Sequence, residues 1–201
     1  GMVDIIRKNR NDWEKVDDSL EKIRLSTKHL LELVSDVLDM SKLEAGMFEI
    51  EEDAFDMSEL MDEVAALVDA QLIESGITHH KYRKNIHTAL CGSSLQLRRI
   101  MLNLLSNAIK YNKPNGRIDT YAEELSCDGT TVWYEFKLVD TGIGMSEEFV
   151  REHLFQPFTQ EKNDARTLYK GTGLGMSIVK ALLEKMGGCI DVESVPGEGS
   201  T

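Results

Sequence analysis

Apolar residues recur with a helical period between positions 13 and 44. Their spacing alternates between four and three residues, a heptad pattern that places them on one face of a helix. The positions are Val16, Leu20, Ile23, Leu30, Val34 and Val37, with Thr27 at the one step without an apolar residue. Leu31 and Leu38 widen this face to that of a helix inside a bundle. The pattern predicts a helix from about Trp13 to Glu44 that needs a partner, such as a second copy of the chain.

The residues at both ends of this segment are typical helix boundaries. Residues 2–10 read as the end of another helix, and Asn11 marks a break. Asp12 can cap the long helix with its side chain, and Gly46 ends it, as glycine commonly does. Residues 1–46 are therefore predicted to be helical.

After position 46 the pattern changes to alternating strands and helices. Strands are predicted near 47–51, 77–83, 86–91, 117–124, 131–139 and 189–193, and helices over about 57–73, 94–111, 146–153 and 174–186. Asp128 and Gly129 favour a hairpin between the two longest strands. A polar loop at 156–172 is longer than compact domains usually leave irregular, so we expect it to be functional. Residues 47–201 are thus predicted to form an α+β domain.

Composition excludes several classes of function. The net charge is −12, which disfavours nucleic acid and anionic membrane surfaces as partners. Neither a signal peptide nor an apolar run of roughly 18 residues occurs, so we expect no membrane contact. Cys91, Cys127 and Cys189 are far apart and contain no CxxC pair. This argues against a disulfide framework or a zinc site and fits the reducing cytoplasm.

The first motif with chemical potential is NLLSNAIKY at 103–111. Asn103 and Asn107 are four residues apart and therefore share one face of the predicted helix. An amide oxygen is a good ligand for a hard cation such as Mg²⁺. Lys110 follows one turn later and can meet a phosphate. By itself, the motif is also compatible with an exposed polar face.

The second motif is DTGIGM at 140–145, directly after a predicted strand. Gly142 and Gly144 allow a tight turn and a close backbone approach to a flat ligand. Asp140 can accept a hydrogen bond from an exocyclic amine, and Met145 offers a soft apolar surface to a ring. An ordinary glycine turn would also explain this motif.

The third motif is KGTGLGMS at 170–177, between the polar loop and a predicted helix. Its glycines free backbone amides at a helix N-terminus, where phosphate binds favourably. It matches neither the Walker pattern nor the Rossmann fingerprint. Two weaker motifs accompany it. LFQPF, with Phe155 and Phe158, could anchor the loop or cap the core, and PGEGST at 196–201 reads as a turn.

Taken together and in this order, the motifs resemble the ATP-binding domain of the sensor histidine kinases over about residues 47–201. LLELVSDVLDMSKLEAG resembles the second helix of their dimerisation and phosphotransfer hairpin, and the loop NDARTLYKGTGLGMSIVK is most similar to hybrid members. The resemblance implies a two-layer α/β sandwich shared with gyrase and MutL, preceded by a bundle-forming helix. It also implies that ATP and Mg²⁺ are cofactors, that a response-regulator receiver domain is a partner, and that the hairpin forms a homodimer.

The resemblance also assigns roles to single residues. Asn107 would ligate Mg²⁺ with Asn103 as its helper, and Asp140 would read the adenine amino group. The complete set implied to hold the nucleotide is Asn103, Asn107, Lys110, Tyr111, Asp140, Gly142, Gly144, Met145, Phe158, Lys170, Gly171, Thr172, Gly173, Leu174 and Gly175.

The sequence departs from the family at the phosphoacceptor. The family carries its histidine in a box of the kind H-E/D-x-R/T-P, and no such box occurs here. Residues 2–10 resemble the tail of the helix that bears this box. We therefore expect a fragment that does not phosphorylate itself. His29 lacks the required residues after it and is expected to lie on a surface or interface. His79, His80 and His87 read as strand or turn histidines.

Three other functions remain as alternatives. An ATP hydrolase of the gyrase and MutL class would use the same pocket, but those enzymes place a glutamate at the position of Asn103 to activate water. A serine kinase of the anti-sigma-factor type would not need the long N-terminal helix. A nucleotide-free pseudokinase would not need Asn107, Asp140 and the GTGLG segment.

Overall fold

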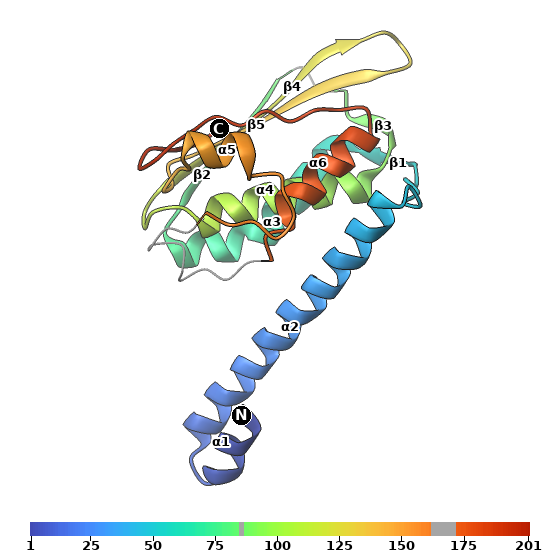
Figure 1. The fold of residues 1–201 in the computed structure, drawn as a ribbon. Helices are drawn as coiled ribbons and strands as arrows, with labels where there is room; N and C mark the ends of the chain where they lie inside the picture. The colour runs from blue at the N-terminus through green and yellow to red at the C-terminus, as the bar shows by residue number, and fades with distance from the viewer. Residues whose placement is uncertain (85–86, 162–171) are drawn as a thin grey trace. The chain divides into compact units, whose positions relative to one another are not determined.

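The computed structural model describes residues 1–84, 87–161 and 172–201, and it divides into two compact units, Gly1–Phe48 and Glu49–Thr201. The first unit contains α1 (Met2–Lys8) and α2 (Trp13–Glu44), which pack against each other (Figure 1). The second unit contains all the strands and the remaining helices. No helix in the described part of the chain combines the length and the apolar character that crossing a membrane requires.

The α2 helix begins and ends where the sequence predicts. The Asp12 side chain accepts a hydrogen bond from the backbone amide of Lys15 at 3.3 Å, which caps the first turn. At the other end Gly46 takes a left-handed φ of 68°. Its amide and that of Met47 donate to carbonyls of the last turn. Several apolar side chains along the helix are exposed, namely Leu20, Leu30, Leu31, Val34 and Leu38. These residues form the exposed apolar stripe.

The second unit is built on a five-stranded sheet in the order β2-β4-β5-β7-β6. Its strands are β2 (Thr78–Lys84), β4 (Arg117–Cys127), β5 (Val132–Asp140), β6 (Ser194–Val195) and β7 (Gly199–Ser200). The β2–β4 pair is parallel and the other pairs are antiparallel. A separate antiparallel ribbon joins β1 (Asp53–Asp56) to β3 (Ala89–Gly92).

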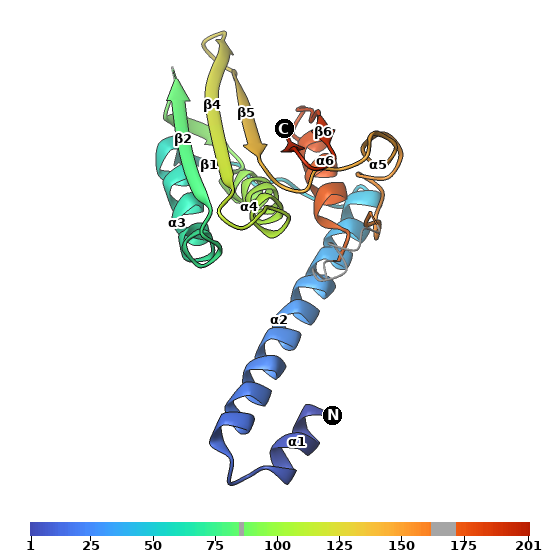
Figure 2. The ribbon, with the colours of Figure 1, turned by 90° about the vertical axis from the view of Figure 1, so that its left-hand side faces the viewer.

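Helices cover one face of this sheet. They are α3 (Met57–Ser75), α4 (Ser94–Lys110) and α6 (Gly175–Lys185), and Figure 2 shows them beside the strands. The short α5 (Glu147–Glu152) precedes the polar loop. Residues of α3, α4 and β4 share one core, which includes Val64, Val68, Leu72, Leu105, Ile109 and Ile118. On α6, Ile178, Val179 and Leu182 are fully buried. The predicted two-layer α/β sandwich is therefore confirmed.

Two predicted strands are wrong in position. Residues 47–51 are irregular, and the ribbon begins later, at Asp53. Residues 189–193 are also outside the strands. β6 begins at Ser194 and the chain turns back through 196–198, although Glu193 also exchanges backbone hydrogen bonds with Thr201. Both segments have alternating apolar residues, but a strand exists only where a neighbouring strand accepts its hydrogen bonds. The hairpin predicted at Asp128 and Gly129 is present between β4 and β5.

Candidate functional site

Helix α4 carries the first motif on one half-buried face. Ile100, Leu105 and Ile109 anchor the helix in the core, which leaves the polar residues of the motif at the edge of the core. The Asn103 side chain donates to the carbonyl of Arg99 at 3.1 Å. The Asn107 side chain makes no hydrogen bond to any residue that the structure describes, so both its oxygen and its nitrogen are available to a ligand.

The second motif packs directly against the C-terminal end of α4. The amide of Ile143 donates to the carbonyl of Tyr111 at 3.0 Å. The amide of Gly142 donates to Asp140 Oδ1 at 2.7 Å. A Cβ on Gly142 would lie 2.4 Å from the Tyr111 carbonyl oxygen, which is closer than real contacts allow. Gly142 therefore lets the 140–144 loop pack on α4 and holds the Asp140 carboxylate in place.

The Lys110 side chain lies beside the same contact. Its Nζ is 4.8 Å from the centre of the Tyr111 ring, a cation–π distance. Tyr111 is the residue on which α4 ends, and its carbonyl is the one that accepts from Ile143. A positive charge is thus held at the junction of α4 and the 140–144 loop.

The turn between β6 and β7 supports the 140–144 loop from the other side. Gly197 donates to the carbonyl of Ile143 at 2.8 Å, and the amide of Met145 donates to Ser194 Oγ at 2.8 Å. Gly144 has a left-handed φ of 64°, and a Cβ there would lie 1.9 Å from the Val195 carbonyl oxygen. The PGEGST segment is therefore part of the framework of this site, although by itself it reads only as a turn.

Burial raises the pKa of the Asp140 carboxyl above its ordinary value of 3.8. Backbone hydrogen bonds from Gly142 and Ser200, together with the charge of Lys113, oppose this shift without cancelling it. A half-buried carboxylate at a strand end, with one oxygen already bonded, is suited to accept one further hydrogen bond.

The third motif meets the first at the start of α6. A Cβ on Gly175 would lie 2.9 Å from Asn103 Oδ1, so the two segments are in direct contact. Gly173 accepts a hydrogen bond from the amide of Phe158 at 3.0 Å and has a left-handed φ of 71°. Leu174 is fully buried, which assigns its side chain to the core. Thr172 Oγ1 accepts from the amide of Leu174 at 3.2 Å.

Part of the predicted set lies outside the described residues. Lys170, Gly171 and most of the 156–172 loop belong to this part, and so does the side chain of His29. Phe158, at the described start of the loop, is exposed and has a positive φ of 63°. It borders a hollow of about 420 Å³ beside α5. The lining of this hollow also includes Ser146, Phe149, His153, Thr159 and Glu161.

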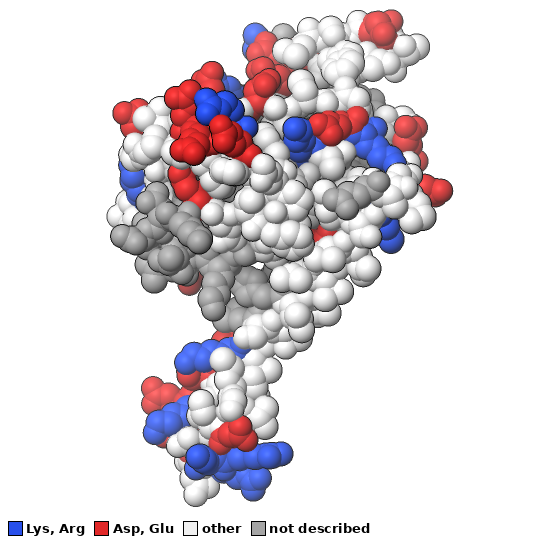
Figure 3. Space-filling view, in the orientation of Figure 1, with Lys and Arg blue, Asp and Glu red and all other residues white. Residues whose placement is uncertain are grey.

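Acidic side chains gather over α5, as Figure 3 shows. Glu148 and Phe149 of this helix also line the hollow. Glu147, Glu148 and Glu152 lie on this helix, with Arg151 among them. The surface charge around α5 is therefore unfavourable for an anionic ligand. This agrees with the expectation that a nucleotide must be held by local groups rather than by the overall field.

Thr141 is a positioning residue that was not predicted from the sequence. Thr141 Oγ1 accepts from the amide of Arg117 at 2.8 Å and donates to Asn112 Oδ1 at 3.2 Å. This hydroxyl ties the 140–144 loop to the segment that connects α4 with β4. Its position between Asp140 and Gly142 was the only signal for this role in the sequence.

The second unit brings together the paired asparagines of α4, the glycine-bordered Asp140 at the end of β5 and the glycine-rich start of α6. This arrangement is typical of a nucleotide-binding domain of the ATPase type. Residues 92–201, more than half of the chain, match the family described as "Histidine kinase-, DNA gyrase B-, and HSP90-like ATPase", and the chain belongs to this family.

Its relatives by sequence are signalling kinases. "Signal transduction histidine-protein kinase BarA" of Escherichia coli K12 is 37% identical over 185 residues, which are 92% of this chain and 20% of that protein. "Hybrid signal transduction histidine kinase B" of Dictyostelium discoideum is 36% identical over 183 residues, 90% of this chain and 9% of that protein. The chain thus spans about a fifth or less of the length of these relatives.

Solved structures show the same fold. Full-length ShkA, crystallised in complex with AMPPNP, superposes with a TM-score of 0.73 at 29% identity. The superposition covers 93% of this chain and 37% of ShkA.

Proposed function

We propose that this chain is the ATP-binding catalytic portion of a sensor histidine kinase that acts in the cytoplasm. Its role is to hold Mg-ATP and present the γ-phosphoryl group to a histidine outside these 201 residues. The observation that carries the proposal is the convergence of three motifs on α4. The 140–144 loop contacts Tyr111, and the start of α6 contacts Asn103.

Asp140 is suited to adenine. Its carboxylate is half-buried and oriented by backbone hydrogen bonds from Gly142 and Ser200, and it has acceptor capacity left for a ligand donor. An adenine amino group donates to such an acceptor, whereas guanine presents a carbonyl oxygen at the same ring position. Met145, half-buried beside the loop, adds an apolar surface for the ring.

The phosphates of ATP would be held by residues of α4 and of the glycine-rich segment. The uncommitted amide of Asn107 is a hard oxygen ligand for Mg²⁺, and Lys110 adds a positive charge nearby. The cation, when bound with ATP, neutralises charge that develops on the phosphates during transfer. Thr172, Gly173 and Gly175 offer donors at the start of α6, to which the resemblance adds Lys170 and Gly171.

We further propose two protein partners. The exposed apolar stripe of α2 would close a four-helix bundle with a second copy of the chain in the complete protein. A response-regulator receiver domain would accept the phosphoryl group from the histidine, as the resemblance to hybrid kinases implies. Neither nucleic acid nor a membrane surface suits the acidic chain.

An ATP hydrolase is the weaker alternative. That chemistry needs a general base beside the attacking water, and the corresponding position holds Asn103. Its amide donates to Arg99 and cannot take up a proton at neutral pH.

Calorimetric titration with Mg-ATP tests the proposal. We expect binding with a dissociation constant between about 1 μM and 1 mM, the usual range for enzyme substrates. A non-hydrolysable analogue should bind with similar affinity. If neither nucleotide produces heat at millimolar concentration, the chain is not an ATP-binding domain and the proposal fails.

A further inference from the structure

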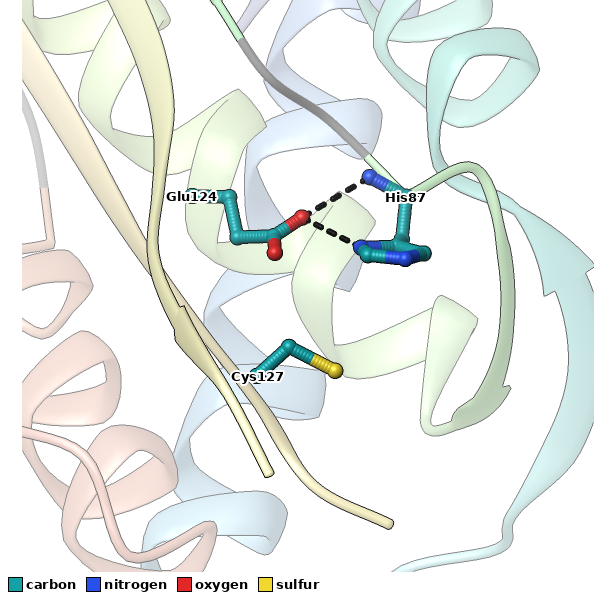
Figure 4. Close-up of side chains that lie close together, drawn as sticks. All are labelled: His87, Glu124 and Cys127. Carbon is teal, nitrogen blue, oxygen red and sulfur yellow. Dashed lines mark hydrogen bonds and ion pairs between the residues drawn. The ribbon is translucent and has the colours of Figure 1, made fainter. Parts of the chain in front are cut away.

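Three metal-ligating side chains lie together at the outer end of the β4–β5 hairpin. His87, Glu124 and Cys127 each present one ligand atom, and these atoms all lie within 4.8 Å of one another (Figure 4). The cluster is remote from the nucleotide site. Cys127 pairs with Val132 near the turn, whereas Asp140 lies at the other end of β5. Asp140 is eight residue steps along the strand from Val132, which is about 26 Å at the usual rise.

A β-bulge brings two of these side chains to the same face of the hairpin. Residues three apart in a regular strand point to opposite faces, so Glu124 and Cys127 would normally diverge. The register passes from Glu124 opposite Tyr134 to Ser126 opposite Trp133, so Leu125 is an extra residue. This insertion turns Glu124 and Cys127 to one side. Bulges often re-aim side chains in this way at functional sites.

Contacts with both strands of the β4–β5 hairpin hold His87 in place. Its backbone amide donates to Glu124 Oε2 at 3.0 Å, and its ring Nδ1 lies 2.7 Å from the same oxygen. The Tyr134 hydroxyl donates to the His87 carbonyl. The Glu124 side chain is only 12% exposed, whereas His87 and Cys127 face solvent. The three groups are therefore preorganised and still reachable by an ion.

Cys127 has a donor of its own. Its Sγ accepts a hydrogen bond from the amide of Gly129 at 3.4 Å, in the turn that follows β4. This contact holds the Cys127 sulfur beside the hairpin turn.

We infer that His87, Glu124 and Cys127 bind a zinc ion. Imidazole nitrogen, carboxylate oxygen and thiolate sulfur are the ligands that Zn²⁺ takes in proteins, and three of them leave a fourth position for water. Zinc bonds of about 2.0–2.3 Å place the ligand atoms of a tetrahedron roughly 3.3–3.8 Å apart. The three ligand atoms lie within 4.8 Å of one another, and the 2.7 Å hydrogen bond between His87 and Glu124 would have to open for the ion to bind between them. The ion would fasten the segment before β3 to the β4–β5 hairpin.

Cobalt substitution tests the site on the whole chain, reduced and free of nucleotide. One equivalent of Co²⁺ should produce a near-ultraviolet band of thiolate–cobalt charge transfer, and Zn²⁺ should abolish it. A large excess of Mg²⁺ should leave it, because Mg²⁺ does not favour thiolate. Cys127→Ser should remove the band, while the matched change Cys189→Ser, at another exposed cysteine, should retain it.

Two further variants examine the other ligands. His87→Ala and Glu124→Gln should each weaken Zn²⁺ binding by at least about tenfold, the scale on which even indirect partners of a metal act. Circular dichroism establishes that each variant is folded. No charge-transfer band with the wild-type chain, or a band that survives Cys127→Ser in a folded protein, would overturn the assignment. So would equal zinc affinity in the wild type, His87→Ala and Glu124→Gln.

Discussion

At the scale of single residues, Asp140 is the group on which nucleotide selectivity should depend most. We expect Asp140→Asn to lower ATP affinity by about ten- to a hundredfold, since a hydrogen bond to a charged group contributes about 1.5–3 kcal/mol. GTP should lose less, because the new amide can donate to the guanine carbonyl. Calorimetry with both nucleotides measures the ratio of their affinities. Equal losses for ATP and GTP would contradict the adenine assignment.

The raised pKa of Asp140 predicts a pH dependence with a definite sign. The folded chain binds this proton more tightly than the unfolded chain, whose carboxyl titrates near 3.8. The contribution of Asp140 to the free energy of unfolding is therefore present below that pH and is lost as pH rises through the raised pKa. Ionisation over the same interval creates the acceptor for adenine, so ATP affinity should rise there.

The ratio of ATP to GTP affinity removes the titration of the phosphates, which both nucleotides share, and comparison with Asp140→Asn removes the titration of the bases themselves. As pH is lowered through the raised pKa, the ratio should fall more steeply in the wild type than in Asp140→Asn. A ratio that does not change with pH in the wild type would remove the ionised carboxylate from adenine recognition.

Asn107 should act on the metal-dependent part of binding. Asn107→Ala removes the amide that no described residue engages, so ATP affinity with Mg²⁺ should fall to about the affinity measured with EDTA. Ser106→Ala is the matched control, because Ser106 is exposed on the same helix and, among the described residues, its hydroxyl donates only to the Asn103 carbonyl. Titrations with and without Mg²⁺ measure the difference. If Mg²⁺ raises the ATP affinity of Asn107→Ala as much as that of the wild type, the metal has another ligand.

At the scale of elements, the contact between the 140–144 loop and the β6–β7 turn should be sensitive to one methyl group. Gly144 and Gly187 both have left-handed φ angles, 64° and 77°. A Cβ on Gly144 would meet Val195 at 1.9 Å, while one on Gly187 would meet nothing within 4 Å. Gly187→Ala should cost about 1 kcal/mol from backbone strain, and Gly144→Ala about 2–5 kcal/mol because overpacking adds to the strain.

Urea unfolding measures the two free energies, and nucleotide titration of both folded variants completes the comparison. Gly144→Ala should also weaken ATP binding, because the displaced loop carries Asp140. Similar free energies of unfolding for the two variants would show that the β6–β7 turn can move to accommodate the methyl group. The packing of this turn would then not hold the 140–144 loop.

At the scale of the whole molecule, the chain has the groups that we propose to hold ATP, but these 201 residues contain no phosphoacceptor box. With γ-labelled ATP we expect no stable acid-labile label on this chain and little hydrolysis, because Asn103 cannot activate water. Adding the acceptor hairpin of a related kinase in trans should produce labelled phosphohistidine on that hairpin, since positioning is the main requirement of phosphoryl transfer. Acid-labile label that maps to His29 would show that the chain carries its own acceptor.

Local patterns in the sequence were sufficient for most elements. The bounds of α2 follow from its apolar period, the cap at Asp12 and the stop at Gly46, because all three act within one turn of helix. The strands predicted at 47–51 and 189–193 failed because a strand depends on hydrogen bonds to a partner strand, and alternating apolar residues do not show where that pairing begins. The order of the sheet could not be read from the sequence for the same reason.

The sequence by itself determined the chemical character of the nucleotide site, since amide, carboxylate and glycine carry their properties wherever they lie. Only the tertiary structure decided which of them meet, through hydrogen bonds such as that from Ile143 to Tyr111. The same holds for the proposed zinc ligands. No CxxC pair signals them, because His87 and Cys127 are forty residues apart and Glu124 reaches their side of the hairpin only through an inserted residue. Spacing along the chain reports proximity within a helix or a turn, whereas a contact across a sheet is fixed by register, and register is a property of the fold.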